Sequence, residues 1–293
     1  MIKVLDLNFL GHQDTIASFL IETLAGPILI ETGPHSTLPV LEKALAEHGY
    51  KKEDIMHVFL THIHLDHAGA AWVFAEHGAT IYLHPKGVQH LSDPSRLLES
   101  ATRIYGNKMD ELWGTLKPIP REQLVSVGHK EKIKIGKTKL KAWHTPGHAV
   151  HHISWEHYGE LIAGDVCGVK IKNGPVVPPC PPPDIDVETW VESIRMIRLN
   201  RFDAIYLTHY GKFDNAKEIC VELSGRLKNW ANWIKPFYEN DMPQVEVVPQ
   251  FQEYVRKQLV AKGVNDEDLA RYEGANPSWM SVAGLYRYWR KKG

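Results

Sequence analysis

Histidine and aspartate are concentrated in four short islands, and this pattern constrains the fold more than any other feature of the chain. The first island, residues 61–67, reads Thr-His-Ile-His-Leu-Asp-His, and the other three centre on His148, Asp165 and His209. Hydrophobic packing does not require such a heptapeptide. Two divalent metals do, since imidazole and carboxylate together are ligands typical of zinc or iron sites. The fold must therefore bring four distant segments together.

Three of the islands follow short apolar segments of the kind that form buried strands. Residues 55–61 run into the first island, residues 160–163 precede Asp165, and residues 202–208 run into His209. Open α/β sheets place their sites outside the strand ends. We therefore predict an α/β fold in which two sheets pack face to face, with helices outside and metals at one edge.

The chain changes character after about residue 212. A stripe of apolar residues at helical spacing follows, made up of Ile219, Leu223, Leu227, Trp230, Ile234 and Phe237. This stripe needs a partner surface, because lone short helices are marginal in water. We predict two parts, a catalytic domain over residues 1–212 and a C-terminal helical extension over residues 213–293.

Two segments are candidates for the walls of a substrate pocket. Residues 175–183 contain six prolines and are predicted to be stiff and close to polyproline II, as a pocket wall or as a connecting loop. Asn276-Pro277 is typical of a helix cap followed by proline at the first helical position. In that last helix, Trp279 or Tyr286 is expected to line the pocket, and the alternative is a dimerisation element.

The spacing within the first island indicates how two metals would be shared. Residues i and i+2 of an extended segment point the same way, so His62 and His64 can hold one ion. Asp66 and His67 follow where the chain turns into a helix, and they can face a second ion. The full predicted ligand set is His62, His64 and His148 for the first metal, Asp66, His67 and His209 for the second, and Asp165 as a bridge between them.

Two divalent cations outweigh the negative charges of Asp66, Asp165 and a bridging hydroxide, so the site is expected to be positive. Such a site stabilises a developing oxyanion and favours an anionic substrate. A metal also lowers the pKa of its bound water to about 7, which supplies a nucleophile at neutral pH. We assign catalytic roles to Asp66, which holds the proton of the nucleophile, and to Tyr210, which polarises a carbonyl or protonates a leaving group.

These motifs resemble those of the metallo-β-lactamase superfamily over about residues 1–212. The matching segments are His62-x-His64-x-Asp66-His67, Thr145-Pro146-Gly147-His148, Gly164-Asp165 and Thr208-His209, and Glu31-Thr32-Gly33 is similar to the Asp-Thr-Gly turn of the family. The resemblance implies an αβ/βα four-layer sandwich and the ligand assignments above. Within the superfamily it is nearest to the hydroxyacylglutathione hydrolases and their lactonase relatives, of which the former also carry helices after the core.

Our leading hypothesis is a dinuclear metal-dependent hydrolase that uses a metal-bridging hydroxide on a thioester, ester or lactone carbonyl. Zn²⁺ is the first choice of metal, with iron or manganese as alternatives. A phosphodiesterase or nuclease is the second hypothesis, because the same metal pair suits attack on phosphate. A mononuclear iron persulfide dioxygenase is the third, which metal analysis would distinguish.

Composition bears on partners and location. The chain has 34 basic and 35 acidic residues, which argues against a general nucleic-acid binder. Its three cysteines form no C-x-x-C pair, and no apolar run approaches the ~18 residues of a membrane span. We therefore expect a cytoplasmic protein that acts on a small molecule and has no nucleic-acid or membrane partner. Its oligomeric state does not follow from the sequence.

Overall fold

The computed structural model describes residues 1–293, and the chain divides into two compact units. Unit 1 comprises residues 1–144 and 153–158, and unit 2 comprises residues 145–152 and 159–293. The first metal island therefore lies in unit 1, whereas His148, Asp165 and His209 lie in unit 2. The predicted domain boundary after residue 212 stays a prediction.

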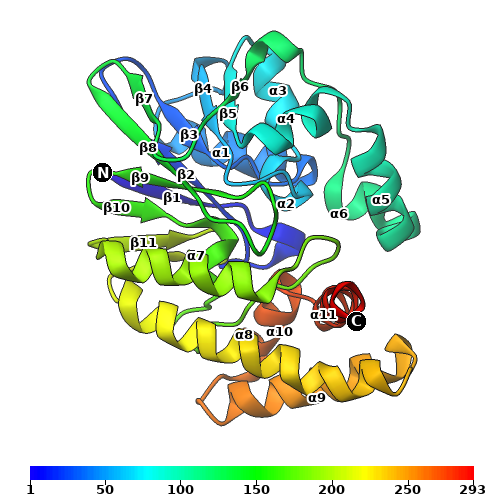
Figure 1. Ribbon diagram of the computed structural model, residues 1–293. Coiled ribbons are helices and arrows are strands. Elements are labelled where there is room, and N and C mark those ends of the chain that lie inside the picture. The colour runs from blue at the N-terminus through cyan, green and yellow to red at the C-terminus, as the bar shows by residue number, and fades with distance from the viewer. The chain divides into compact units, whose positions relative to one another are not determined.

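The first sheet lies in unit 1 and has the strand order β1-β2-β3-β4-β5-β6 (Figure 1). Its strands are β1 (Ile2–Asp6), β2 (Ala17–Ile21), β3 (Ile28–Ile30), β4 (His57–Phe59), β5 (Thr80–Leu83) and β6 (Leu124–Ser126). The first three strands pair antiparallel, and β3 to β6 pair parallel. Parallel pairing brings the carboxyl ends of β3 and β4 to one edge, where Glu31 and the first island begin.

Unit 1 has the α-helices α1 (Leu38–Glu47), α2 (Leu65–Ala68), α3 (Ala71–Glu76), α4 (Pro85–Ser92), α5 (Ser95–Tyr105) and α6 (Met109–Trp113). Of these, α1, α3 and α4 pack against strands of the first sheet. Leu41 and Leu45 of α1 and Phe74 of α3 are buried against strand residues such as Val58 and Ile81. Burial of this apolar surface is the main favourable term in folding the unit.

Three antiparallel strands complete unit 1, namely β7 (Lys132–Ile135), β8 (Thr138–His144) and β9 (Ile153–His157). Trp155 of β9 packs edge-on against Phe59 of β4, with ring centroids 5.0 Å apart. Its indole N–H donates to the Leu60 carbonyl at 3.0 Å, and the Ile153 N–H donates to the Thr61 carbonyl at 2.7 Å. These bonds fix the backbone immediately before the first island.

Unit 2 contains the strands β10 (Glu160–Ile162), β11 (Ala204–Leu207) and β12 (Gly211–Phe213). The β10–β11 pair is parallel and the β11–β12 pair is antiparallel, so this sheet is mixed, like the first. Helix α7 (Val187–Asn200) joins the parallel pair. The Asp186 carboxylate accepts from the Thr189 N–H at 2.9 Å and so caps the start of this helix.

Four helices follow in unit 2, as the predicted helical extension requires: α8 (Ala216–Glu239), α9 (Gln244–Val260), α10 (Asp266–Ala275) and α11 (Ser278–Lys292). Figure 1 shows α8 and α9 side by side, and Trp230 of α8 meets Phe251 of α9 edge-on at 4.9 Å. The apolar stripe of α8 is buried, as its spacing predicts. No helix of the chain combines the length and apolarity needed to cross a bilayer.

The predicted cap at Asn276 is wrong. Helix α11 begins at Ser278, and Pro277 occupies the capping position. The Glu273 carboxylate caps the helix instead, accepting from the Ser278 N–H at 2.9 Å and from the Ser278 hydroxyl at 2.7 Å. Asn276 instead donates to the Pro178 carbonyl at 3.2 Å and accepts from the Ser281 hydroxyl at 3.1 Å.

The proline-rich segment 175–183 is held by the last two helices. The Tyr272 hydroxyl donates to the Pro175 carbonyl at 2.7 Å, and the Arg287 side chain donates to the Pro183 carbonyl at 3.1 Å. Gly284 of α11 lies so close that an added Cβ would stand 1.9 Å from the Cys180 carbonyl oxygen. The helical extension therefore determines where this segment runs.

We predict that Gly284→Ala destabilises the protein by about 1–3 kcal/mol, the usual cost of overpacking. The matched control is Gly225→Ala in α8, where an added Cβ meets nothing within 4 Å. That variant should gain about 0.5–1 kcal/mol, because glycine is unfavourable inside an exposed helix. Urea unfolding followed by circular dichroism measures both. A stability gain in Gly284→Ala would show that α11 does not constrain the proline segment.

Candidate metal centre

The first island places four predicted ligands at the carboxyl end of β4 in unit 1. His62 and His67 are buried, whereas His64 and Asp66 are half-buried. His62 Nε2 lies 2.9 Å from His64 Nδ1, so the two imidazoles converge as the i, i+2 spacing predicts. Asp66 Oδ2 lies 3.5 Å from His67 Nε2, so the second pair converges too. Nitrogen and carboxylate donors gathered in this way fit a zinc or iron site.

The Thr61 hydroxyl fixes the tautomer of His62. This hydroxyl donates its single proton to Glu31 Oε1, so it accepts from the His62 Nδ1–H at 2.9 Å. A proton on Nδ1 puts the lone pair of His62 on Nε2, the atom that faces His64. A metal-binding imidazole is oriented in the same way, by a hydrogen bond to its other nitrogen.

Glu31 connects both pairs of predicted ligands in unit 1. Its Oε1 accepts from His67 Nδ1 at 3.2 Å, and its Oε2 accepts from the Thr61 N–H at 3.3 Å. The donor atoms of Glu31, His62 and His67 all lie within 4.8 Å of one another. The Glu31 side chain is fully buried, so its negative charge acts on these imidazoles without screening by solvent.

Sequence reasoning did not place Glu31 among the site residues. The available signal was the Glu31-Thr32-Gly33 turn, in which Glu31 and Gly33 have φ of 62° and 67°. The Thr32 N–H donates to the His67 carbonyl at 2.8 Å, so the turn also holds the backbone of the island. A Cβ on Gly33 would stand 2.1 Å from Leu7 Cδ1, so only glycine fits there.

Unit 2 brings together the other three predicted ligands, all of them buried. Asp165 Oδ2 lies 3.4 Å from His148 Nε2, and Asp165 Oδ1 lies 3.6 Å from His209 Nε2. One carboxylate thus presents one oxygen to each imidazole, the arrangement expected of a bridging ligand. The three residues reach this place from three loops: His148 after β8, Asp165 in the turn after β10, and His209 after β11.

The proline-rich segment orients His148. His148 Nδ1 donates to the Pro179 carbonyl at 2.9 Å, which puts the lone pair on Nε2 toward Asp165. Gly147 allows helix α7 to approach, because an added Cβ would stand 2.2 Å from the Trp190 Cα. Trp190 lies edge-on to His148 at 5.4 Å, and its indole donates to the Val166 carbonyl at 2.8 Å. Through the Pro179 carbonyl the segment thus orients a predicted ligand, and its role as a pocket wall stays a prediction.

Two tyrosines lie next to predicted ligands. Tyr210 follows His209 and is half-buried, with its backbone N–H donating to the Lys170 carbonyl at 3.3 Å. Its catalytic role stays a prediction. Tyr105, at the end of α5, was not anticipated. Burial raises the pKa of Tyr105 above its usual value, and the nearby Asp66 carboxylate adds to this effect.

Further histidines surround these groups without belonging to the predicted ligand set. His84 Nδ1 accepts from the Lys86 N–H at 3.0 Å, so this side chain caps helix α4. Burial lowers the pKa of His84 to about 4, and His144, whose tilted ring lies 4.3 Å away between centroids, contributes. In unit 2, His152 bonds the Thr145 hydroxyl at 2.7 Å. These contacts assign structural roles to His84 and His152.

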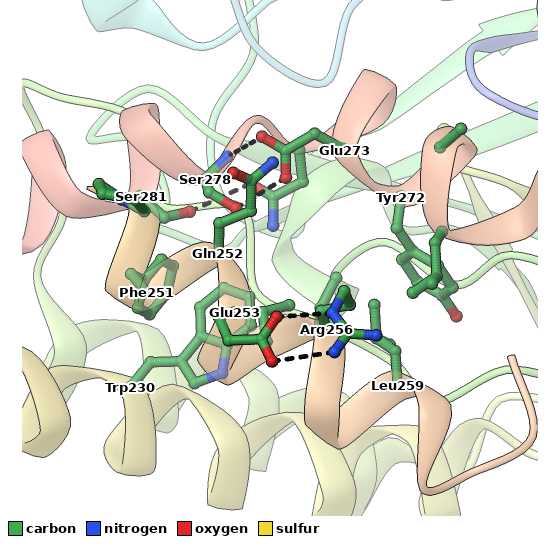
Figure 2. A pocket seen from close by; sticks show the side chains of 16 residues that line it. Trp230, Phe251, Gln252, Glu253, Arg256, Leu259, Tyr272, Glu273, Ser278 and Ser281 are labelled. Carbon is green, nitrogen blue, oxygen red and sulfur yellow. Dashed lines mark hydrogen bonds and ion pairs between the residues drawn. The ribbon is translucent and has the colours of Figure 1, made fainter. Parts of the chain in front are cut away.

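The helical extension encloses a cavity of about 410 Å³. Figure 2 shows its apolar lining, which includes Trp230, Phe251 and Leu259, together with the Glu253–Arg256 ion pair. None of the predicted ligands of unit 2 lines this cavity, and neither do Trp279 and Tyr286. The Tyr286 hydroxyl donates to the Met242 carbonyl at 2.9 Å within the extension. That Trp279 or Tyr286 lines a substrate pocket stays a prediction.

The donor groups can now be compared with known proteins. A family model described as "Metallo-beta-lactamase superfamily" matches residues 13–209, a range that includes all seven predicted ligands. This chain belongs to the metallo-β-lactamase superfamily. The resemblance inferred from the sequence motifs is confirmed at this level, and the nearer likeness to hydroxyacylglutathione hydrolases or lactonases stays a prediction.

Two curated relatives match part of the chain. The metallo-β-lactamase fold-containing protein ST1585 of Sulfurisphaera tokodaii is 30% identical over 149 residues, which are 47% of this chain and 54% of that protein. The probable metallo-hydrolase YqjP of Bacillus subtilis is 26% identical over 187 residues, 58% of each chain. The matches thus span little more than half the length of either relative.

Solved structures confirm the predicted fold class. The metallo-β-lactamase family protein TTHA1429 of Thermus thermophilus has a TM-score of 0.68 at 18% identity, covering 100% of this chain and 94% of that one. The ST1585 structure has a TM-score of 0.64 at 21% identity, covering 78% and 85%. The fold is the metallo-β-lactamase fold with two mixed sheets, followed by α8–α11.

We predict that Glu31→Gln weakens metal binding about 10–100-fold, the usual effect of losing a partner behind a metal-binding histidine. The substitution keeps the shape of the side chain but removes the charge that holds His67 and Thr61. Competition with a chromophoric chelator measures the affinity. Glu22→Gln, an exposed position at the end of β2, is the matched control and should bind metal normally. Equal affinities in the two variants would show that Glu31 does not position the ligands.

Proposed function

We propose that the chain is a dinuclear metal-dependent hydrolase of thioesters, esters or lactones. The observation that carries the proposal is the Asp165 carboxylate, which presents one oxygen to His148 and the other to His209. A carboxylate that faces two imidazoles suits two ions rather than one. The name of YqjP, a probable metallo-hydrolase, supports the same class of reaction.

In this proposal the donor groups of the two units act together. His62, His64 and His148 would hold one metal, Asp66, His67 and His209 would hold the other, and Asp165 would be shared between them. When bound, such metals supply an activated water, because they lower its pKa to about 7, and they polarise the scissile carbonyl. The seven ligands are too many for one tetrahedral ion.

The protein residues contribute orientation and proton transfer. The Asp66 side chain is 21% exposed, which supports its assignment as the group that holds the proton of the attacking water. The mechanism assigns Tyr210, which is half-buried beside His209, to polarise the carbonyl or protonate the leaving group. Glu31, Thr61 and the Pro179 carbonyl keep the imidazoles in one tautomer throughout the cycle.

Protein saturated with zinc, iron or manganese should contain two metals per chain by elemental analysis. The loaded protein should hydrolyse members of a panel of thioesters, esters and lactones faster than bis(p-nitrophenyl) phosphate, and removal of metal by a chelator should abolish turnover. A limit of one metal per chain would contradict the dinuclear assignment. A preference for the phosphodiester would favour the nuclease hypothesis.

We predict that Asp165→Ala loses one metal and lowers kcat by more than about 100-fold, since even outer partners of metal ligands are worth about 10–100-fold. The matched control is Asp214→Ala in the same unit, whose carboxylate is 81% exposed. This control should keep both metals and full turnover. Unchanged metal content in Asp165→Ala, with the fold intact by circular dichroism, would show that Asp165 is not a ligand.

A further inference from the structure

The hairpin of β7 and β8 is strongly basic in a chain whose total charge is balanced. Residues 130–141 contain six lysines and a single acidic residue, Glu131. The strand register places Lys132 opposite Lys141 and Lys134 opposite Lys139. Because side chains alternate along a strand, these four lysines share one face of the hairpin, which we call the lysine face. Ile135 and Leu140 are buried on the other face.

Repulsion between the charges of the lysine face lowers the stability of the isolated protein. Like charges directly opposite each other on neighbouring strands are destabilising. Lys141 is compensated, since its Nζ lies 3.1 Å from Glu156 Oε2 and over the Trp143 ring. Lys132, Lys134 and Lys139 are exposed, and no carboxylate lies within ion-pair distance of them.

Protection of a sheet edge does not account for the whole face. Lysines commonly shield an edge strand from pairing with another chain, and β7 is the edge strand of its sheet. Lys139 and Lys141, however, belong to β8, which is paired on both sides. Of these two, Lys139 is exposed and uncompensated, and its charge on a strand paired on both sides indicates a ligand with negative charge.

Two exposed apolar side chains adjoin the tip of this hairpin. Leu24 is 95% exposed, in a turn whose Ala25 would contact a Cβ added to Gly136 of the tip. Tyr158 is 72% exposed, and its hydroxyl donates to the Lys137 carbonyl at 3.4 Å. A leucine, a tyrosine and several lysines at one end of unit 1 are typical of proteins that lie on a lipid surface.

We propose that this end of unit 1 docks on the surface of an anionic phospholipid bilayer. The lysine face and Lys137 attract the head groups, Leu24 enters the acyl boundary, and Tyr158 lies at the level of the head groups. The fully exposed leucine favours lipid over nucleic acid, which would use arginine and stacking aromatic rings. The proposal replaces the sequence-based expectation that the protein has no membrane partner.

Docking in this orientation leaves the metal donors of unit 1 accessible. The turn that carries Leu24 precedes β3, which runs parallel to β4. It therefore lies at the amino ends of these strands, whereas His62 and His64 follow the carboxyl end of β4. The β7–β8 hairpin (Figure 1) lies next to that turn, because Gly136 at its tip packs against Ala25. Bound lipid would thus face the end of the sheet opposite to the ligands.

Vesicle co-sedimentation of the metal-loaded full chain tests the proposal. The protein should bind phosphatidylcholine vesicles that contain about 30 mol% phosphatidylglycerol, and should bind pure phosphatidylcholine poorly. Lys134→Glu/Lys139→Glu should weaken binding by at least about tenfold, given the contribution of each lysine near an anionic surface. Raising the salt from about 0.05 to 0.5 M should weaken the binding of the unsubstituted protein.

Two further variants separate the contributions. Leu24→Ser should reduce binding but leave its salt dependence unchanged, because it removes an apolar contact and no charge. Lys217→Glu/Lys228→Glu makes the same charge change on exposed positions of α8 and should bind vesicles normally. All variants should keep their metal content, since none of these residues is a ligand.

Three results would overturn the proposal. If the protein did not bind anionic vesicles, the lysines would act only to shield the edge strand from pairing with another chain. If the α8 control lost vesicle binding to the same extent, binding would depend on the net charge of the protein rather than on the lysine face. Tighter binding to single-stranded or duplex DNA in fluorescence anisotropy, dependent on Lys134 and Lys139 but not on Leu24, would assign the face to nucleic acid.

Discussion

The arrangement of the predicted metal ligands in unit 1 depends on one buried carboxylate. Glu31 bonds Thr61 and His67, which are far away in the sequence, and through Thr61 it also fixes the tautomer of His62. A buried charge is tolerated only where hydrogen bonds compensate it, so Glu31 and the island stabilise each other. Glu31 and Gly33 both have left-handed backbone angles, and in the turn that they form the Glu31 carboxylate bonds Thr61 beyond the carboxyl end of β4.

Those parts of the fold and site that depend on local spacing could be predicted from the sequence. The convergence of His62 with His64 follows from the alternation of an extended chain, and the Asp186 cap follows from the residue types at a helix start. Glu31 was missed because its role depends on Thr61, 30 residues away. Asn276 was assigned to a cap because sequence cannot reveal that the Pro178 carbonyl lies within reach.

The helical extension and the metal donors of unit 2 are linked through the proline-rich segment. Helices α10 and α11 contact this segment through Tyr272, Asn276 and Gly284, and the segment presents the Pro179 carbonyl to His148. Each proline fixes its own φ and restricts the residue before it, so little conformational freedom is lost when the segment is fixed. The extension thus has a role in ordering a ligand, in addition to any contact with substrate.

The acceptor for His148 is a main-chain oxygen, and this has an evolutionary consequence. Every residue type carries a carbonyl, so substitutions at position 179 can alter the neighbouring surface without deleting the hydrogen bond to the imidazole. Insertions and deletions between residues 175 and 183 would move the oxygen instead. Relatives are therefore expected to vary in side chains along this segment while keeping its length, and length differences there should coincide with changes in metal affinity.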